Sequence, residues 1–244
     1  MPGIEHEEAR IRRVYTAYAE NGHGESKWSL ENPGNVAINL ERSRALGKML
    51  DKSGFKPLAD ERILEVGCGG GRVIEELIGL GACPRLLAGV DLRPEGIESA
   101  QSRWPEADLR VADAQQLPFV AESFGLVIVF TVFSSILDGE VANRVAQEIC
   151  RVLKPGGGVV YYDFQYNNPW NPEVRGIKRS EVETLFAGFR GHWMSLTLLP
   201  QLARRLGPLT PFAYPALAAI APLRTHLLGV LTKPPQLARD AFGP

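Results

Sequence analysis

The sequence predicts an α/β fold, in which a doubly wound, mostly parallel sheet of seven strands carries helices on both faces. Two observations support this prediction. Between residues 61 and 164, short apolar runs rich in β-branched residues alternate with amphipathic helical patterns, as βαβ units require. The length of 244 residues, with 45% hydrophobic and 23% charged residues, suits one globular domain with additions at its ends.

The first 58 residues precede the first core strand, and we expect them to form a helical cap over the loops of the sheet. Apolar periodicity predicts helices over residues 11–19 and 36–50. The segment between them is rich in glycine and proline, which predicts turns. Residues 1–58 are therefore assigned as an N-terminal cap of the same domain, and residues 59–244 as the domain proper.

The core elements follow in alternation. A helix with Val73, Ile74 and Leu77 on one face follows the first strand, and a helix that begins near Pro94 follows the second. Asp138 is a suitable N-cap for a third helix, which ends before the glycine-rich run 154–158. The strands themselves are predicted over residues 62–66, 86–91, 108–111, 125–130 and 158–164.

After the fifth strand the sequence predicts a short helix, two more strands and an insertion. Ser180 and Glu183 have the spacing of a capping box for a helix ending near Gly188, and strands are predicted over 192–199 and 227–233. Residues 200–223 are longer and more apolar than an ordinary connection. We expect this helical insertion to form a lid or wall of an acceptor pocket, with Phe212 and Tyr214 in contact with the acceptor. Burial against the core or in a homodimer interface is an equally good alternative.

Composition and charge argue against several classes of function. A net charge of −1 without clustered Lys or Arg disfavours DNA or large RNA as a partner. Cys68, Cys83 and Cys150 lack the spacing of a disulfide framework or a zinc site, so no metal is expected. The N-terminus lacks the apolar stretch of a signal peptide, and the most apolar segment is too short to cross a bilayer. We therefore expect a cytoplasmic protein without a transmembrane segment.

A glycine-rich turn directly follows the first strand, where residues 63–71 are Ile-Leu-Glu-Val-Gly-Cys-Gly-Gly-Gly. Glycine lets the backbone turn sharply and approach a ligand closely. The NAD fingerprint G-x-G-x-x-G, started at Gly67, would require glycine where Arg72 stands. Asp91 ends the second strand, 20 residues after Gly71, where a carboxylate can accept hydrogen bonds from ribose hydroxyls. The pattern predicts a nucleoside-containing cofactor with a spacing unlike that of NAD enzymes.

Four successive motifs resemble those of class I S-adenosylmethionine (SAM)-dependent methyltransferases that act on small molecules. The motifs are residues 65–71, 90–92, 111–114 and 153–157, and the resemblance covers residues 61–164. It implies a Rossmann-like fold, SAM as cofactor and S-adenosylhomocysteine (SAH) as product. It also implies that Asp113 binds the adenine amino group, that Ala114 supplies a backbone contact, and that Phe130 and Thr131 lie beside the cofactor. No Asn-Pro-Pro-Tyr follows the fourth strand, which disfavours a nucleobase acceptor.

Two sets of residues are assigned to the site. Glu65 is expected to form an acidic wall for the ammonium and sulfonium groups of SAM. The predicted cofactor-binding residues are Glu65, Gly67, Cys68, Gly69, Gly71, Asp91, Leu92, Asp113, Ala114, Phe130 and Thr131, with Trp28 of the cap as a roof. The predicted acceptor-pocket residues are Tyr15, Tyr18, Tyr166, Trp170, Phe212 and Tyr214. No catalytic base is assigned.

Methyl transfer is an in-line displacement, which a protein can accelerate by holding acceptor and sulfonium in a dry, near-attack geometry. We therefore hypothesise a SAM-dependent methyltransferase that acts on an O or N atom of a small molecule, such as a hydrophobic or secondary metabolite. Two alternatives remain open. One is a non-catalytic SAM-binding regulatory or assembly module, and the other is an NAD-dependent oxidoreductase, which Arg72 disfavours.

Overall fold

A seven-stranded sheet organises the part of the chain that the computed structural model describes, residues 2–20, 29–169 and 171–235. The strand order is β3-β2-β1-β4-β5-β7-β6. The strands are β1 (Ile63–Val66), β2 (Leu87–Asp91), β3 (Asp108–Val111), β4 (Phe124–Phe130), β5 (Leu153–Phe164), β6 (Arg190–Leu198) and β7 (Arg224–Thr232). The first five are mutually parallel, and β7 is antiparallel to both of its neighbours. The predicted doubly wound, mostly parallel sheet is confirmed.

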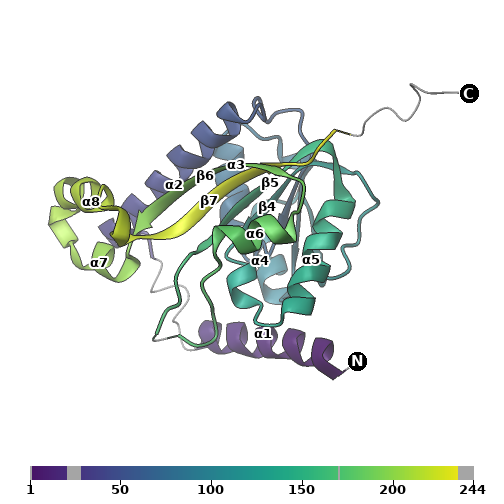
Figure 1. Cartoon of the computed structure of the whole chain (residues 1–244), viewed down its shortest axis with the longest axis horizontal. Coiled ribbons are helices and arrows are strands. Elements are labelled where there is room, and N and C mark those ends of the chain that lie inside the picture. The colour runs from purple at the N-terminus through teal and green to yellow at the C-terminus, as the bar shows by residue number, and fades with distance from the viewer. Residues whose placement is uncertain (1, 21–28, 170, 236–244) are drawn as a thin grey trace, which may run out of the picture.

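Helices cover both faces of this sheet (Figure 1). One face carries α2 (Pro33–Lys52), α3 (Arg72–Gly79) and α4 (Pro94–Arg103), and the other carries α5 (Gly139–Val152) and α6 (Arg179–Leu185). The helix α5 follows its sequence signals closely, because Val141, Val145 and Ile149 are all buried. At its start, the Asp138 carboxylate accepts hydrogen bonds from the amides of Glu140 and Val141.

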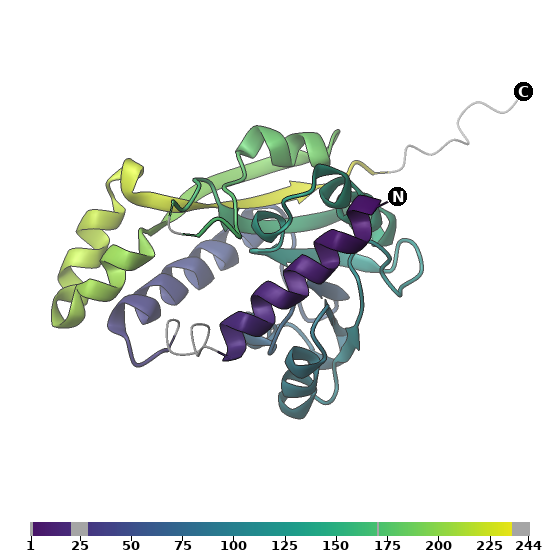
Figure 2. The ribbon, with the colours of Figure 1, turned by 90° about the horizontal axis from the view of Figure 1, so that it is seen from below.

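Two helical segments lie outside these layers. The helix α1 (Pro2–Glu20) crosses the edge of the sheet where the parallel strands end, as the two orthogonal views show (Figures 1 and 2). The insertion between β6 and β7 contains α7 (Pro200–Arg205) and α8 (Thr210–Ala218), which lie at one end of the molecule. Ile38 of α2, Leu198 of β6 and Tyr214 of α8 share a small apolar cluster that fixes the insertion to α2.

Some boundaries differ from the expectations. The first helix begins nine residues earlier than predicted, at Pro2. The predicted capping box at Ser180 is wrong, because α6 begins at Arg179 with Lys178 at the N-cap and no side-chain capping bond. Glu183 instead forms an ion pair with Arg179, with Nε and Oε1 2.8 Å apart. That i, i+4 pair uses the Glu183 carboxylate on the helix surface, with the guanidinium of Arg179 as its partner.

Candidate cofactor site

The turn between β1 and α3 holds its backbone in conformations that favour glycine. Gly67 has a φ of 76° and Gly69 a φ of 47°, both in the left-handed region. The amides of Gly67 and Cys68 both donate to the carbonyl oxygen of Val90, at 2.8 and 3.0 Å. A Cβ on Gly67 would lie only 2.7 Å from a methyl group of Val132. The turn is therefore fixed to the end of β2, and Val132 packs against it at Gly67.

A cavity opens beside this turn, at the carboxyl ends of β1, β2 and β4. Its walls include eight of the predicted cofactor residues: Gly67, Gly69, Asp91, Leu92, Asp113, Ala114, Phe130 and Thr131. The strand order reverses between β1 and β4, so the cavity lies at the topological switch point of the sheet. Open α/β sheets bind nucleotides at this position.

Asp91 is held inside the cavity by main-chain donors. Its Oδ2 accepts a hydrogen bond from the amide of Gly69 at 2.8 Å, and its Oδ1 accepts one from the amide of Arg93 at 2.9 Å. The Arg93 guanidinium, with Nε 3.6 Å from Oδ1, lies over the ring of Tyr15. Each carboxylate oxygen can accept a further hydrogen bond. Asp91 can therefore bind ribose hydroxyls while it holds the glycine turn.

Two further parts of the wall are locally fixed. The Asp113 carboxylate accepts hydrogen bonds from the amide and the side-chain nitrogen of Gln115, at 2.8 and 2.9 Å, in an Asx-turn. Thr131 follows β4 with a φ of 54°, which is unfavourable for a β-branched residue. Its amide donates to the carbonyl oxygen of Tyr162 at 2.7 Å, which holds it there. Backbone strain of this kind is concentrated at ligand sites.

The helix α1 forms the roof of the cavity. Its residues Glu8, Ile11, Arg12 and Tyr15 line the cavity. The Arg12 guanidinium donates to the carbonyl oxygen of Leu92 at 2.6 Å, and the Tyr15 hydroxyl is 2.7 Å from the hydroxyl of Ser135. The helix thus bridges the loop after β2 and the loop after β4.

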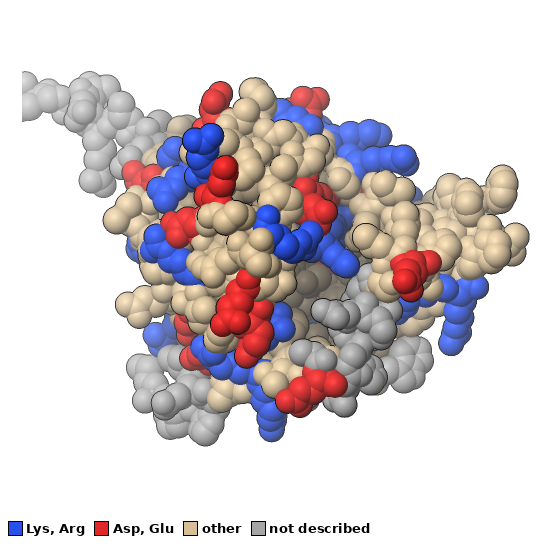
Figure 3. Space-filling view, turned by 180° about the vertical axis from the view of Figure 1, so that it is seen from behind, with Lys and Arg blue, Asp and Glu red and all other residues tan. Residues whose placement is uncertain are grey.

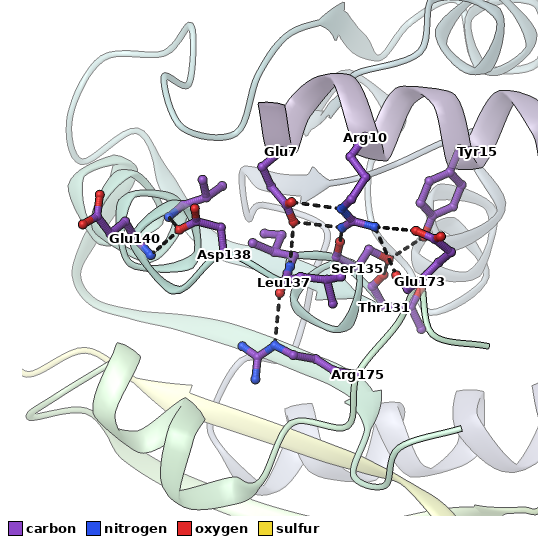
Figure 4. A network of polar contacts seen from close by, with 12 residues as sticks. Glu7, Arg10, Tyr15, Thr131, Ser135, Leu137, Asp138, Glu140, Glu173 and Arg175 are labelled. Atoms are coloured by element: carbon purple, nitrogen blue, oxygen red, sulfur yellow. Dashed lines mark hydrogen bonds and ion pairs between the residues drawn. The ribbon is translucent and has the colours of Figure 1, made fainter. Parts of the chain in front are cut away.

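An ion-pair network fastens α1 to the protein (Figure 4). The Glu7 carboxylate pairs with the Arg10 guanidinium and accepts a hydrogen bond from the amide of Leu137 at 2.6 Å. Arg10 also donates to the carbonyl oxygen of Ser135 at 2.6 Å and pairs with Glu173 at 2.9 Å. The bond from Arg10, aided by that from Leu137, holds the pKa of Glu7 below its usual value. The charged form of Glu7 therefore stabilises the docked helix.

Three predicted cofactor residues do not line the cavity. Side chains alternate along β1, and because Val66 faces the cavity, Glu65 faces α2 and α3. There it is buried, and burial raises its pKa well above the usual value against the opposing effect of Arg42. The structure therefore gives no acidic wall at the predicted place. Cys68 is also buried, with a raised thiol pKa, and packs against Gly89.

Gly71, the third of these residues, has a structural task. It is the N-cap of α3 with a φ of 77°. A Cβ at this position would lie 3.1 Å from the Trp104 ring and 3.2 Å from the Ala100 methyl group. The residue is therefore required for packing of α3 against α4.

The aromatic residues predicted for the acceptor pocket do not form one group. Tyr15 lines the cavity, and Tyr18 packs edge-on against it with ring centroids 5.7 Å apart. The Tyr18 hydroxyl donates to Asn171 Oδ1 at 3.1 Å. Tyr166 is exposed and is not part of the cavity wall. The predicted residues Trp28 and Trp170 lie outside the described residues.

The insertion has no place at this cavity. Phe212 is 82% exposed, whereas Tyr214 is buried and its hydroxyl donates to Glu41 Oε2 at 2.7 Å. Neither residue lines the cavity, and α7 and α8 contribute nothing to its wall. The insertion packs instead on α2 and β6, away from this cavity, and its role as a lid or wall of an acceptor pocket stays a prediction.

Sequence reasoning missed a buried acid beneath the site. Asp163 ends the apolar run of β5 and is fully buried. Its carboxylate accepts hydrogen bonds from the amides of Ser134 and Phe164, at 2.9 and 2.8 Å. Burial raises its pKa to about 6. The residue supports the turn that carries Ser135, and an acid at the end of the buried, uncharged run 159–162 was the signal that could have identified it.

Two further observations concern the described residues alone. They contain no group of three His, Cys, Asp or Glu side chains placed to hold a metal ion. None of their helices combines the length and apolar character needed to cross a membrane.

Comparison with known proteins agrees with the geometry. Residues 63–157 match a family described as a methyltransferase domain. The chain is 34% identical over 148 residues to phthiotriol/phenolphthiotriol dimycocerosates methyltransferase of Mycobacterium leprae, which covers 58% of this chain and 53% of that protein. It is 38% identical over 138 residues to the human mitochondrial ubiquinone biosynthesis O-methyltransferase, and this match covers 53% of this chain and 36% of that protein. The chain thus spans about half or less of these relatives.

Solved structures resemble the fold. A SAM-dependent methyltransferase from Mesorhizobium loti matches with a TM-score of 0.59 and 18% identity, over 78% of this chain and 96% of that one. At this identity the likeness shows the fold alone. The assignment of the site therefore depends on the residues at the carboxyl ends of the strands.

Proposed function

We propose that this chain, in which residues 63–157 match a methyltransferase domain, is a class I SAM-dependent methyltransferase. It transfers the SAM methyl group to an O or N atom of a small, hydrophobic acceptor. The observation that carries the proposal is the cavity at the switch point. It brings the glycine turn together with Asp91 and Asp113, two carboxylates at the ends of neighbouring strands.

The residues of the cavity fit SAM. Both Gly67 and Gly69 border the cavity, and the open space beside Gly69 leaves room for the methionine portion. Asp91 can accept hydrogen bonds from both ribose hydroxyls. In the proposed complex Asp113 accepts a hydrogen bond from the adenine amino group, and the apolar residues Val132 and Ile136 line the same cavity. SAM, when bound, supplies a methyl group on a positively charged sulfur.

The chain contributes enclosure and orientation. The roof formed by α1 covers part of the cavity, and reduced contact with water would favour transfer of the methyl group to the acceptor over side reactions. The hydroxyls of Tyr15 and Ser135 lie at the junction of roof and wall, where they can orient the accepting atom. The relatives are named as methyltransferases of phthiotriol dimycocerosates and of ubiquinone biosynthesis, which supports a small hydrophobic acceptor.

The first test is calorimetric titration of the purified protein with SAH and, separately, with NADH. We expect SAH to bind with micromolar affinity or better and NADH not to bind.

The second test incubates the protein with methyl-labelled SAM and fractions of a metabolite extract. Label in an organic-soluble product supports the proposed reaction. A protein that binds SAH but labels nothing is the regulatory or assembly module, and one that binds NADH instead is an oxidoreductase.

A further inference from the structure

Residues 208–222, the second part of the insertion between β6 and β7, present an entirely apolar surface to solvent. Between residues 208 and 222, every exposed residue is apolar: Pro208, Leu209, Pro211, Phe212, Pro215, Ala216, Ala219, Ile220, Ala221 and Pro222. The polar side chains of this stretch, Thr210 and Tyr214, are buried, and their hydroxyls donate to Gly207 O and Glu41 Oε2. A surface helix ordinarily turns its polar residues outward. We call the ten exposed residues the apolar tip.

The apolar tip is convex and lies at an extremity of the molecule. Figures 1 and 2 both show α7 and α8 at one end, beyond the sheet, and Figure 3 shows that end largely free of charged side chains. Leu209 and Phe212 are 66% and 82% exposed. Leu40 of α2 and Met194 of β6, also exposed, line the adjoining groove together with Pro211. The apolar surface thus extends from the tip to α2 and β6.

The charges around the apolar tip are predominantly basic. Residues 200–224 contain Arg204, Arg205 and Arg224 and no Asp or Glu. Arg44 and Lys48 of α2 line the adjoining groove. The acidic residues of that groove are Glu31 and Glu41, and the Glu41 carboxylate is turned inward to the Thr197 amide and the Tyr214 hydroxyl. The surroundings therefore favour an anionic partner.

We propose that the apolar tip docks on the surface of an anionic lipid bilayer, with Leu209, Phe212 and Ile220 entering the acyl boundary and Arg205 remaining among the headgroups. A protein partner would need hydrogen-bonding groups across the interface, at about one bond per 100–200 Å². The exposed side chains of the apolar tip offer none. The hydrocarbon of a bilayer penalises unpaired polar groups, so a convex surface without them suits a membrane.

Vesicle flotation of the full chain, without SAM, tests this binding. Vesicles of equal parts phosphatidylcholine and phosphatidylglycerol should carry the protein, and pure phosphatidylcholine vesicles should carry less. F212S should lower the partition coefficient at least about tenfold, because burial of a large apolar side chain contributes roughly 1.5–3 kcal/mol. R205Q should lower binding to the anionic vesicles about fivefold, with little effect on the neutral ones.

V120S is the matched control, because Val120 is 77% exposed but lies in the loop between β3 and β4. It should bind vesicles as the wild type does. Both serine variants should keep the wild-type melting temperature, since both side chains are exposed. Absence of binding to anionic vesicles, or equal losses in F212S and V120S, would overturn the proposal. A wild-type dimer that F212S converts to a monomer would assign the tip to a second copy of the chain and would also overturn it.

Discussion

Asp91 combines two tasks, because its carboxylate holds the Gly69 amide and also faces the cavity. A loss of SAH affinity in D91A could therefore result from a displaced glycine turn or from the loss of a ribose contact. A second ligand, an SAH analogue that lacks both ribose hydroxyls, separates them. Removal of the hydroxyls should weaken binding to the wild type about tenfold to a hundredfold, as expected for charge-assisted hydrogen bonds, and leave binding to D91A unchanged.

Calorimetric titration of the wild type and of D91A, each with SAH and with the analogue, provides the four affinities of a double-mutant cycle. D108A is the control, because Asp108 is half-buried and pairs with Arg110 away from the cavity. It should discriminate between the two ligands as the wild type does. Equal discrimination by D91A would show that the ribose hydroxyls bind elsewhere.

Gly67 and Gly69 belong to the same turn, with Cys68 between them, and a side chain would be unfavourable at each for a different reason. A Cβ on Gly67 would collide with Val132, whereas a Cβ on Gly69 would meet only Arg93 Nη2, at 3.6 Å, and Asp91 Oδ2, at 4.0 Å. We therefore expect G67A to lower the free energy of unfolding by about 2 kcal/mol or more. G69A should cost about 1 kcal/mol for its left-handed φ, yet lower SAH affinity more than tenfold by filling ligand space.

Urea unfolding and SAH titration of the two variants provide the comparison. A G69A variant with wild-type SAH affinity would place the cofactor away from the turn. A G67A variant as stable as the wild type would show that Val132 moves aside at little cost.

The sequence predicted eight residues that line the cavity, because motif positions and strand ends coincide. Asp91 and Asp113 follow β2 and β3, and the carboxyl ends of parallel strands form one crevice. Glu65 was misplaced because a motif position does not reveal on which face of the sheet a side chain lies. Because side chains alternate along a strand, Glu65 lies on the face opposite to Val66. Its face is known only once the structure shows that Val66 borders the cavity.

At the scale of elements, α1 is the part of the site whose position depends on a few polar contacts. E7Q keeps the shape of the side chain but loses the charge that pairs with Arg10. The docked state of α1 should lose about 1–3 kcal/mol, so its amides should exchange hydrogen faster. Apparent SAH affinity should fall several-fold, because fewer molecules have the roof closed.

Hydrogen exchange followed by mass spectrometry, with and without SAH, measures this change. R13A is the control, because Arg13 is exposed on the same helix. Neither variant should slow or speed exchange in β4, which lies in the core. Unchanged exchange of α1 in E7Q would mean that apolar packing alone docks the helix.

The elements that the sequence located best are those with a strong periodic signal. All seven strands and the buried face of α5 followed from apolar patterns. The insertion lacks such a periodic signal. Composition shows that residues 200–223 are apolar, but it does not show which side of each helix packs against the rest of the protein. Tertiary contacts decide that Tyr214 turns inward to Glu41 while Phe212 points to solvent. Composition alone therefore could not predict that Phe212 would be exposed and Tyr214 buried.

At the scale of the whole molecule, the sequence order of the strands does not determine their spatial order. β7 inserts between β5 and β6, so the last strand of the sequence is internal to the sheet and the insertion is carried to its far edge. This arrangement separates the apolar tip from the cofactor cavity, with which the groove beside the tip shares no residue. Cofactor binding and lipid binding should therefore respond to different substitutions.

Buried Asp163 links the stability of the whole fold to pH. Burial raises its pKa from 3.8 to about 6. Between these values the folded state binds more protons than the unfolded state, so this contribution to stability is complete below the lower pKa and is lost as the pH rises through 6. The lowered pKa values of Glu7 and Glu148 act in the opposite direction.

The comparison of D163N with the wild type isolates the contribution of Asp163, because Glu7 and Glu148 are present in both proteins. The asparagine oxygen can still accept one of the two amide bonds, and the loss of the other is a cost that does not vary with pH. From about pH 4 to about pH 7, the unfolding free energy of D163N relative to wild type should rise by about 2–3 kcal/mol. Urea unfolding at intermediate pH values measures this difference. If it is flat across the range, Asp163 has an ordinary pKa in the folded protein, and solvent or a compensating cation must reach it.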